Sequence, residues 1–245
     1  MTKTDVRRSF VPFHSSYLFE LATKAQKDSG GIPCSIMSVA AIEALPGDIA
    51  VSLHARQEFE KTARNESNQN QDRWGRKKWE FTVSNLEPLT PMERGFADRI
   101  KELTDQKRSG LDQYYVLDGL LREETRNPTD PKDKKAAWRS TLPEGVGELF
   151  ELRNAIVHRG GSEFLYDHDG ALVNASRALP PVLTALKDVL NIDTSNSQCS
   201  GWLELIDTPA LARWSLSVTK YFINRTLETL PDTAGFTYLK HNAHL

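Results

Sequence analysis

Cysteine is nearly absent from the sequence. Only Cys34 and Cys199 occur in 245 residues, far apart along the chain. Two distant cysteines supply neither the paired spacing of a zinc site nor the several cysteines of a disulfide framework. We therefore expect two reduced thiols in a cytoplasmic protein. The N-terminus, MTKTDVRRSFVPFH, also lacks the apolar core and the cleavage site of a signal peptide.

Long apolar runs and an excess of basic residues are also lacking. No run approaches the ~18 apolar residues that suggest a membrane span, so the sequence predicts no membrane partner. The 31 Lys and Arg residues are balanced by 33 Asp and Glu residues, which leaves a net charge of −2. A protein that covers nucleic acid with a broad basic face is usually basic overall. Any contact with nucleic acid is therefore expected to be local.

What the chain does contain is apolar residues at helical spacing, over a length sufficient for one large domain. A helix is predicted to start near Ser35, and Pro46-Gly47 is expected to kink or break it. Another begins at Thr90-Pro91-Met92-Glu93, which has the form of a capping box with proline in the first turn. The other predicted helices cover residues 15–28, 111–126, 144–159, 176–190 and 208–230.

Three polar or turn-rich segments interrupt this pattern. RNESNQNQD, residues 64–72, is predicted to be an exposed loop within a loop insertion over 62–90, and a second insertion covers 127–143. EFLYDHDGALVN, residues 163–174, places two short apolar runs around a turn signal, which is typical of a β-hairpin. The predicted fold is one all-α domain, residues 1–245, with a small β-hairpin.

The stretch ELRNAIVHRGG, residues 151–161, combines an apolar helix with unexpected polar side chains. On a helical wheel Arg153 lies inside the apolar arc, whereas Asn154 and His158 share the neighbouring polar face with Glu151. A charge within an apolar arc is costly unless it is paired or meets another surface. Arg153 and His158 are also about 140° apart, which is too divergent for one helix to aim both at one target.

Two interpretations of this stretch are open. In the structural one, Arg153 pairs with a carboxylate such as Glu43, while Asn154 and His158 cap or bond the backbone. In the functional one, Arg153, Asn154 and His158 converge on a phosphate, because arginine offers a fork of donors and histidine exchanges protons near neutral pH. With 17 Arg and 6 His in the chain, about 0.4 Arg-x4-His pairs are expected by chance, and one occurs.

Arg153-Asn154-x-x-x-His158 resembles the Arg-x4–6-His motif of the HEPN superfamily (higher eukaryotes and prokaryotes nucleotide-binding domains), whose ribonuclease branches commonly have Asn after the Arg. The run SVAAIEA, residues 38–44, is similar to the family's early helix with its Glu-Ala pair, here Glu43-Ala44. The segment TPALARWSLSVTKYFINRTLETLP is similar to the terminal helix of several subfamilies. Pro46-Gly47 departs from the family pattern, and residues 62–143 match none of it.

The resemblance implies a HEPN-like helical bundle and a metal-independent endoribonuclease that acts as a homodimer and needs no cofactor. Two motifs would face each other in one cleft, where a 2′-hydroxyl attacks the phosphate and leaves a 2′,3′-cyclic phosphate. His158 would then be the general acid or base, and Arg153 would stabilise the phosphoryl charge. Asn154 would position His158 or a phosphate oxygen, with Glu43 in support. A role as a toxin or phage-defence effector, with an antitoxin or sensor partner, is implied by the same analogy.

Alternatives of other classes are a non-catalytic HEPN module that binds nucleotide, RNA or protein, and a helical scaffold whose motif is accidental. A second candidate RNA contact is the basic and aromatic run Arg73-Trp74-Gly75-Arg76-Lys77-Lys78-Trp79. The alternative interpretation of this run is a solvated loop that is anchored to the core by its tryptophans. His158, Asp167, His168 and Asp169 have no spacing typical of metal ligands, and a turn explains the last three, so no metal is predicted.

Overall fold

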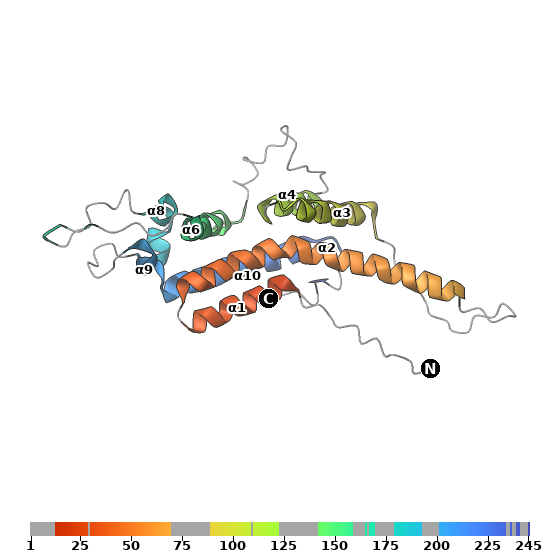
Figure 1. The fold of residues 1–245 in the computed structure, drawn as a ribbon, viewed down its shortest axis with the longest axis horizontal. Helices are drawn as coiled ribbons and strands as arrows, with labels where there is room; N and C mark the ends of the chain where they lie inside the picture. Colours follow the sequence, from red (N-terminus) through yellow and green to blue (C-terminus); the bar gives the residue numbers. More distant parts are fainter. Residues whose placement is uncertain are drawn as a thin grey trace, which may run out of the picture.

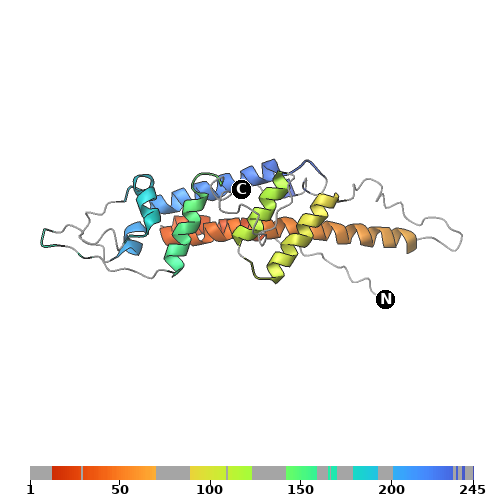
Figure 2. The ribbon, with the colours of Figure 1, turned by 90° about the horizontal axis from the view of Figure 1, so that it is seen from above.

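A long central helix, α2 (Gly31–Gln69), organises the structure. The computed structural model describes residues 13–28, 30–69, 89–108, 110–122, 142–158, 165, 167–169, 179–192, 201–233, 236, 239, 240 and 245. At about 1.5 Å per residue, α2 is roughly 58 Å long, and the molecule is elongated along it (Figures 1 and 2). The described residues are all-α, as predicted. The remaining helices are α1 (His14–Lys27), α3 (Pro91–Asp105), α4 (Gly110–Leu121), α6 (Val146–His158), α8 (Pro181–Leu190), α9 (Trp202–Ile206) and α10 (Pro209–Thr229).

The helices form two layers around α2. Helix α10 lies beside α2, α1 packs against both, and α3, α4 and α6 cross α2 on its other side (Figures 1 and 2). The main core lies between these layers and includes Ile42, Leu45, Ile49, Leu149 and Phe222. A second apolar cluster, which includes Leu152, Leu186 and Trp202, joins α6, α8 and α9. Helix α6 therefore contributes to both clusters.

Helix α2 continues through Pro46, so the break that was the stronger form of the prediction at Pro46-Gly47 does not occur. Proline lacks the N–H that would donate to the carbonyl of Ile42, so the helix loses one hydrogen bond there. On either side Ile42, Leu45 and Ile49 are fully buried between the layers. Packing from both sides holds the helical path, and local propensity is overridden.

Residues Gly31–Glu58 of α2 are long and apolar enough to cross a membrane, with a mean hydropathy of 1.6. The sequence predicts no such segment because Ser, Glu and Asp interrupt every apolar run, yet the average over a window passes the criterion. Of that window 56% is buried inside the molecule. The core helix of a bundle has the same composition, so this feature leaves the cytoplasmic location a prediction.

Two other predicted boundaries are wrong. Residues 62–69, expected to belong to a loop, continue α2, because the segment contains neither Gly nor Pro and its Arg, Glu and Gln residues are compatible with a helix. Helix α8 begins at Pro181 and not at residue 176, since proline suits the first helical position. Most of the predicted hairpin, most of the 127–143 insertion and all of residues 70–88 lie outside the described residues.

The predicted helix starts at the other two sites are confirmed. Thr90 and Glu93 form the capping box of α3, and Thr208 caps α10, with Pro209 in its first turn. Asp207, which precedes this cap, accepts a hydrogen bond of 2.8 Å from the backbone N–H of Ile32 at the start of α2. These caps fix where α3, α2 and α10 begin.

Candidate functional site

Helix α6 carries the candidate motif across the N-terminal part of α2 (Figure 2). Its buried residues are Val146, Leu149, Phe150, Leu152 and Ala155, which anchor it in both apolar clusters. Val157, which the wheel places in the apolar arc, is 54% exposed. The apolar arc is thus narrower than predicted, and α6 ends with Val157 and His158 on the surface.

Arg153 is paired with Glu43 of α2. Its Nη2 donates a hydrogen bond to Glu43 Oε1, and the two side chains are 23% and 30% exposed respectively. The guanidinium also lies 5.9 Å from the ring centre of Phe150, over its face. The ion pair that the structural interpretation of the sequence predicts is therefore present, with the same partner. It joins residues 110 positions apart in the chain.

Glu43 is confined by α4 as well as by Arg153. A Cβ placed on Gly110, the first residue of α4, would lie 2.5 Å from Glu43 Cγ, so only glycine leaves room there. Burial raises the pKa of the Glu43 carboxyl, and the charge and hydrogen bond of Arg153 offset part of that rise. Helices α2, α4 and α6 thus meet at this ion pair.

A groove of about 550 Å³ lies on the other side of the motif. Asn154, Ala155 and His158 of α6 line it with Glu151, and the start of α8 supplies the remaining wall through Pro180, Pro181 and Val182. Asn154 and His158 are exposed, and neither side chain has a hydrogen-bond partner among the described residues. The backbone-bonding role that the structural interpretation assigns to them is not seen in this part of the chain.

The structure therefore separates the motif into two parts. Asn154 and His158 share the groove, whereas Arg153 is directed to the adjacent face, toward Glu43. The divergence expected from the helical wheel is confirmed for a single chain. Sequence reasoning missed Pro180, Pro181 and Val182, because no local pattern signals that the start of α8 approaches α6.

The structure supports no site at the other two candidate segments, which are the basic run at residues 73–79 and the Asp167-His168-Asp169 turn, in the part of the chain that it describes. Residues 73–79, which contain Arg73, Trp74, Arg76, Lys77, Lys78 and Trp79, lie outside the described residues. Asp167 Oδ1 accepts a hydrogen bond of 3.0 Å from the N–H of Asp169, as in an Asx-turn, and His168 Nε2 lies 3.2 Å from Asp169 Oδ2. Among the described residues no three His, Cys, Asp or Glu side chains are grouped to hold a metal.

Comparison of the chain with models of protein families, with curated proteins and with solved structures finds no match. The residues and their geometry are therefore the basis on which a function can be argued.

Proposed function

We propose that the protein is a metal-independent endoribonuclease of the HEPN type, with an active site assembled from the α6 helices of two copies. The observation that carries the proposal is the pair Asn154 and His158, exposed and without described partners in a groove of about 550 Å³. An imidazole on the wall of an open groove is accessible to a substrate. Arg153, which precedes Asn154 in sequence, is held in one orientation by Glu43.

The proposed chemistry uses only the side chains of Arg153, Asn154 and His158 and needs no metal. His158 of one copy takes the proton of a ribose 2′-hydroxyl while the 2′-oxygen bonds to phosphorus. The bond from phosphorus to the 5′-oxygen breaks, and the leaving oxygen takes a proton from solvent, to which the imidazolium then returns its own proton. The products are a 2′,3′-cyclic phosphate and a 5′-hydroxyl. Asn154 positions the imidazole or a phosphate oxygen.

Arg153 would stabilise the charge that develops on the phosphoryl oxygens. A guanidinium has five N–H donors, and the contact with Glu43 engages one nitrogen. The remaining donors can meet a phosphate while Glu43 fixes the orientation of the group. Since Arg153 and His158 diverge on one helix, the arginine would serve the histidine of the partner copy.

A non-catalytic module that binds RNA, nucleotide or protein is the second candidate. The observation that favours it is the same ion pair, because a carboxylate beside Arg153 weakens its field for a phosphate. The net charge of −2 points the same way. Both candidates use the groove, and they differ in whether a phosphodiester bond breaks.

Cleavage of single-stranded and structured RNA in the presence of EDTA tests the proposal. We expect His158→Ala to lose activity by about 100-fold or more, since a positioned acid or base contributes about 10²–10⁴-fold. Arg153→Ala should lose a comparable amount. His168→Ala, which changes an exposed histidine in a turn, is the matched control and should retain activity.

Product analysis adds a second criterion. The wild type should leave 2′,3′-cyclic phosphate ends, and a strand with 2′-deoxyribose at the cleaved position should resist cleavage. Equal cleavage by the wild type and His158→Ala would contradict the catalytic proposal. Binding of RNA without cleavage, lost in Asn154→Ala and His158→Ala, would support the non-catalytic module instead.

A further inference from the structure

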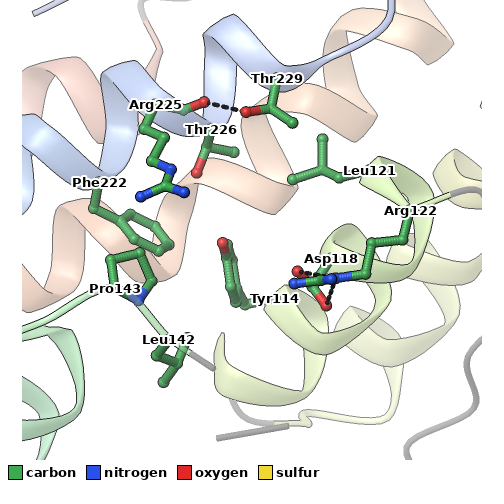
Figure 3. A pocket seen from close by; sticks show the side chains of 10 residues that line it. All are labelled: Tyr114, Asp118, Leu121, Arg122, Leu142, Pro143, Phe222, Arg225, Thr226 and Thr229. Atoms are coloured by element: carbon green, nitrogen blue, oxygen red, sulfur yellow. Dashed lines mark hydrogen bonds and ion pairs between the residues drawn. The ribbon is translucent and has the colours of Figure 1, made fainter. Parts of the chain in front are cut away.

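A second pocket, of about 290 Å³, lies between α4, α10 and the segment that leads into α6 (Figure 3). Helix α4 provides Tyr114 and Asp118, the residue after it is Arg122, and α10 provides Arg225 and Thr226. The side chains come from segments about 100 residues apart in sequence. None of the residues that line this pocket lines the groove at His158. The complete lining is Tyr114, Asp118, Leu121, Arg122, Leu142, Pro143, Phe222, Arg225, Thr226 and Thr229.

Two guanidinium groups reach this pocket from opposite helices. Arg122 Nε donates to both carboxylate oxygens of Asp118, at 3.2 and 3.1 Å. Arg225 donates from Nη1 to the hydroxyl of Tyr221 at 2.7 Å, and among the described residues no carboxylate lies within ion-pair distance of it. Asp118 is the only acidic residue in the lining, so the charged side chains leave an excess of one positive charge.

Tyr114 forms the floor between the two arginines. Its ring centre lies 4.7 Å from that of Phe222, which fixes the ring in place. Burial raises the pKa of the Tyr114 hydroxyl to about 12, and a hydrogen bond with Thr226 offsets part of that rise. The phenol is protonated at neutral pH, as an ordinary tyrosine is, and its hydroxyl lies beside that of Thr226. In Figure 3 the hydroxyls of Tyr114 and Thr226 and the guanidinium of Arg225 lie on the same side of the pocket.

We propose that this pocket binds a small phosphate-bearing anion, with Arg225 as the principal cation and with Tyr114 and Thr226 as hydroxyl partners. Guanidinium groups match the paired oxygens of a phosphate, and hydroxyl donors complete its hydrogen bonds. The volume of about 290 Å³ is just below the range of about 300–1,000 Å³ that is usual for pockets of drug-sized ligands, which favours a small anion. Arg122 contributes less, because its guanidinium is already hydrogen-bonded to the carboxylate of Asp118. The inference is independent of the proposed ribonuclease activity.

Calorimetric titration of the full chain with inorganic phosphate, at constant ionic strength set with KCl, tests this site. The wild type should bind with 1:1 stoichiometry per chain. Arg225→Gln should weaken binding by about tenfold or more, because it removes a charge-assisted contact. Asp118→Asn should strengthen binding severalfold, because it removes the one competing carboxylate. Opposite changes in affinity from the two variants cannot result from partial unfolding.

Arg213→Gln is the matched control, since it removes an exposed arginine of α10 that does not line the pocket, and it should bind like the wild type. A second titration with a nucleoside 5′-monophosphate distinguishes a phosphoester from free phosphate as the preferred source of the anion. Tighter binding of the monophosphate supports the former, and equal affinity supports the latter. Absence of heat with both anions, or equal affinity of Arg225→Gln and the wild type, would overturn the proposal. Cleavage by His158 needs no anion in this pocket, so either idea can fail alone.

Discussion

At the scale of single residues, the pair Glu43 and Arg153 shows how one contact can serve both stability and a site. Glu43 is 30% exposed, so its charge is only partly solvated, and Arg153 is the positive group beside it. Burial is nevertheless the larger influence on the carboxyl, whose pKa is raised. The carboxylate therefore orients Arg153 but is itself held at a cost in free energy.

This balance predicts a pH dependence of stability. Because the pKa of Glu43 is higher in the folded state than in the unfolded chain, the folded state binds the proton more tightly. The contribution of Glu43 to the free energy of unfolding should then fall as the pH rises from the unfolded value, about 4.5, through the higher folded value. Urea denaturation between pH 4 and 8 measures it as the difference between the wild type and Glu43→Gln.

That difference should decline with rising pH and flatten above the folded pKa. Glu144→Gln, at an exposed position just before α6, should show no such decline. If the difference instead grew with pH, the attraction of Arg153 would outweigh burial, and the assigned balance would be wrong. At fixed pH the magnitude depends on how far solvent screens the pair.

At the scale of helices, the glycines of α2 and α4 give opposite predictions. Gly47 lies inside α2 with open space where a Cβ would stand, so Gly47→Ala should stabilise the protein by about 0.5–1 kcal/mol. At Gly110 the added Cβ would lie 2.5 Å from Glu43 Cγ, so Gly110→Ala should destabilise by about 1–3 kcal/mol. Thermal unfolding of both variants measures the signs.

Gly110→Ala should also displace Glu43 and so disturb the orientation of Arg153. In the cleavage assay its activity should fall even at temperatures where it is folded, whereas Gly47→Ala should match the wild type. Equal melting temperatures for the two variants would mean that α4 yields freely at Gly110. In that case the meeting point of α2, α4 and α6 would not be rigid.

Which helices could be predicted from the sequence follows from the range of the signals. The starts of α3 and α10 were predictable because their caps lie within three residues of the helices that they begin. The continuation of α2 through Pro46 was not predictable, because it depends on packing by the helices of both layers. Asp48 is a similar case. It accepts hydrogen bonds from the backbone N–H groups of His14 and Ser15 and so caps α1 from a position more than 30 residues away.

Some features of the candidate site could likewise be predicted from the sequence, and others could not. The wheel of α6 predicted that Arg153 and His158 diverge, since that depends on helix geometry alone. The choice of Glu43 as partner could be suggested because the sequence offers it as a carboxylate within an apolar helix. The groove wall from Pro180 to Val182 could not be predicted, because only the tertiary fold brings α8 to α6.

At the scale of the whole molecule, an elongated bundle presents α6 and α8 on one outer layer, next to each other (Figures 1 and 2). These helices expose Val157 and Val189, which are 54% and 59% accessible. A two-fold partner packed here would cover apolar surface and would bring a second Arg153 toward the groove. A dimer of twice 27.6 kDa is therefore expected by light scattering at micromolar concentration.

Complementation between two inactive variants tests the composite site directly. If each site takes Arg153 from one copy and His158 from the other, a mixed dimer of Arg153→Ala and His158→Ala keeps one intact combination. Co-expression at equal levels gives about half mixed dimers, so activity should return to roughly a quarter of the wild-type value, while each variant alone stays inactive. The control is co-expression of His158→Ala with Asn154→Ala/Arg153→Ala/His158→Ala, which leaves no intact histidine. Activity that is restored only in the first mixture requires a shared site. Mixed dimers can be isolated with two affinity tags. If they show no restored activity, each chain works alone or the motif does not catalyse.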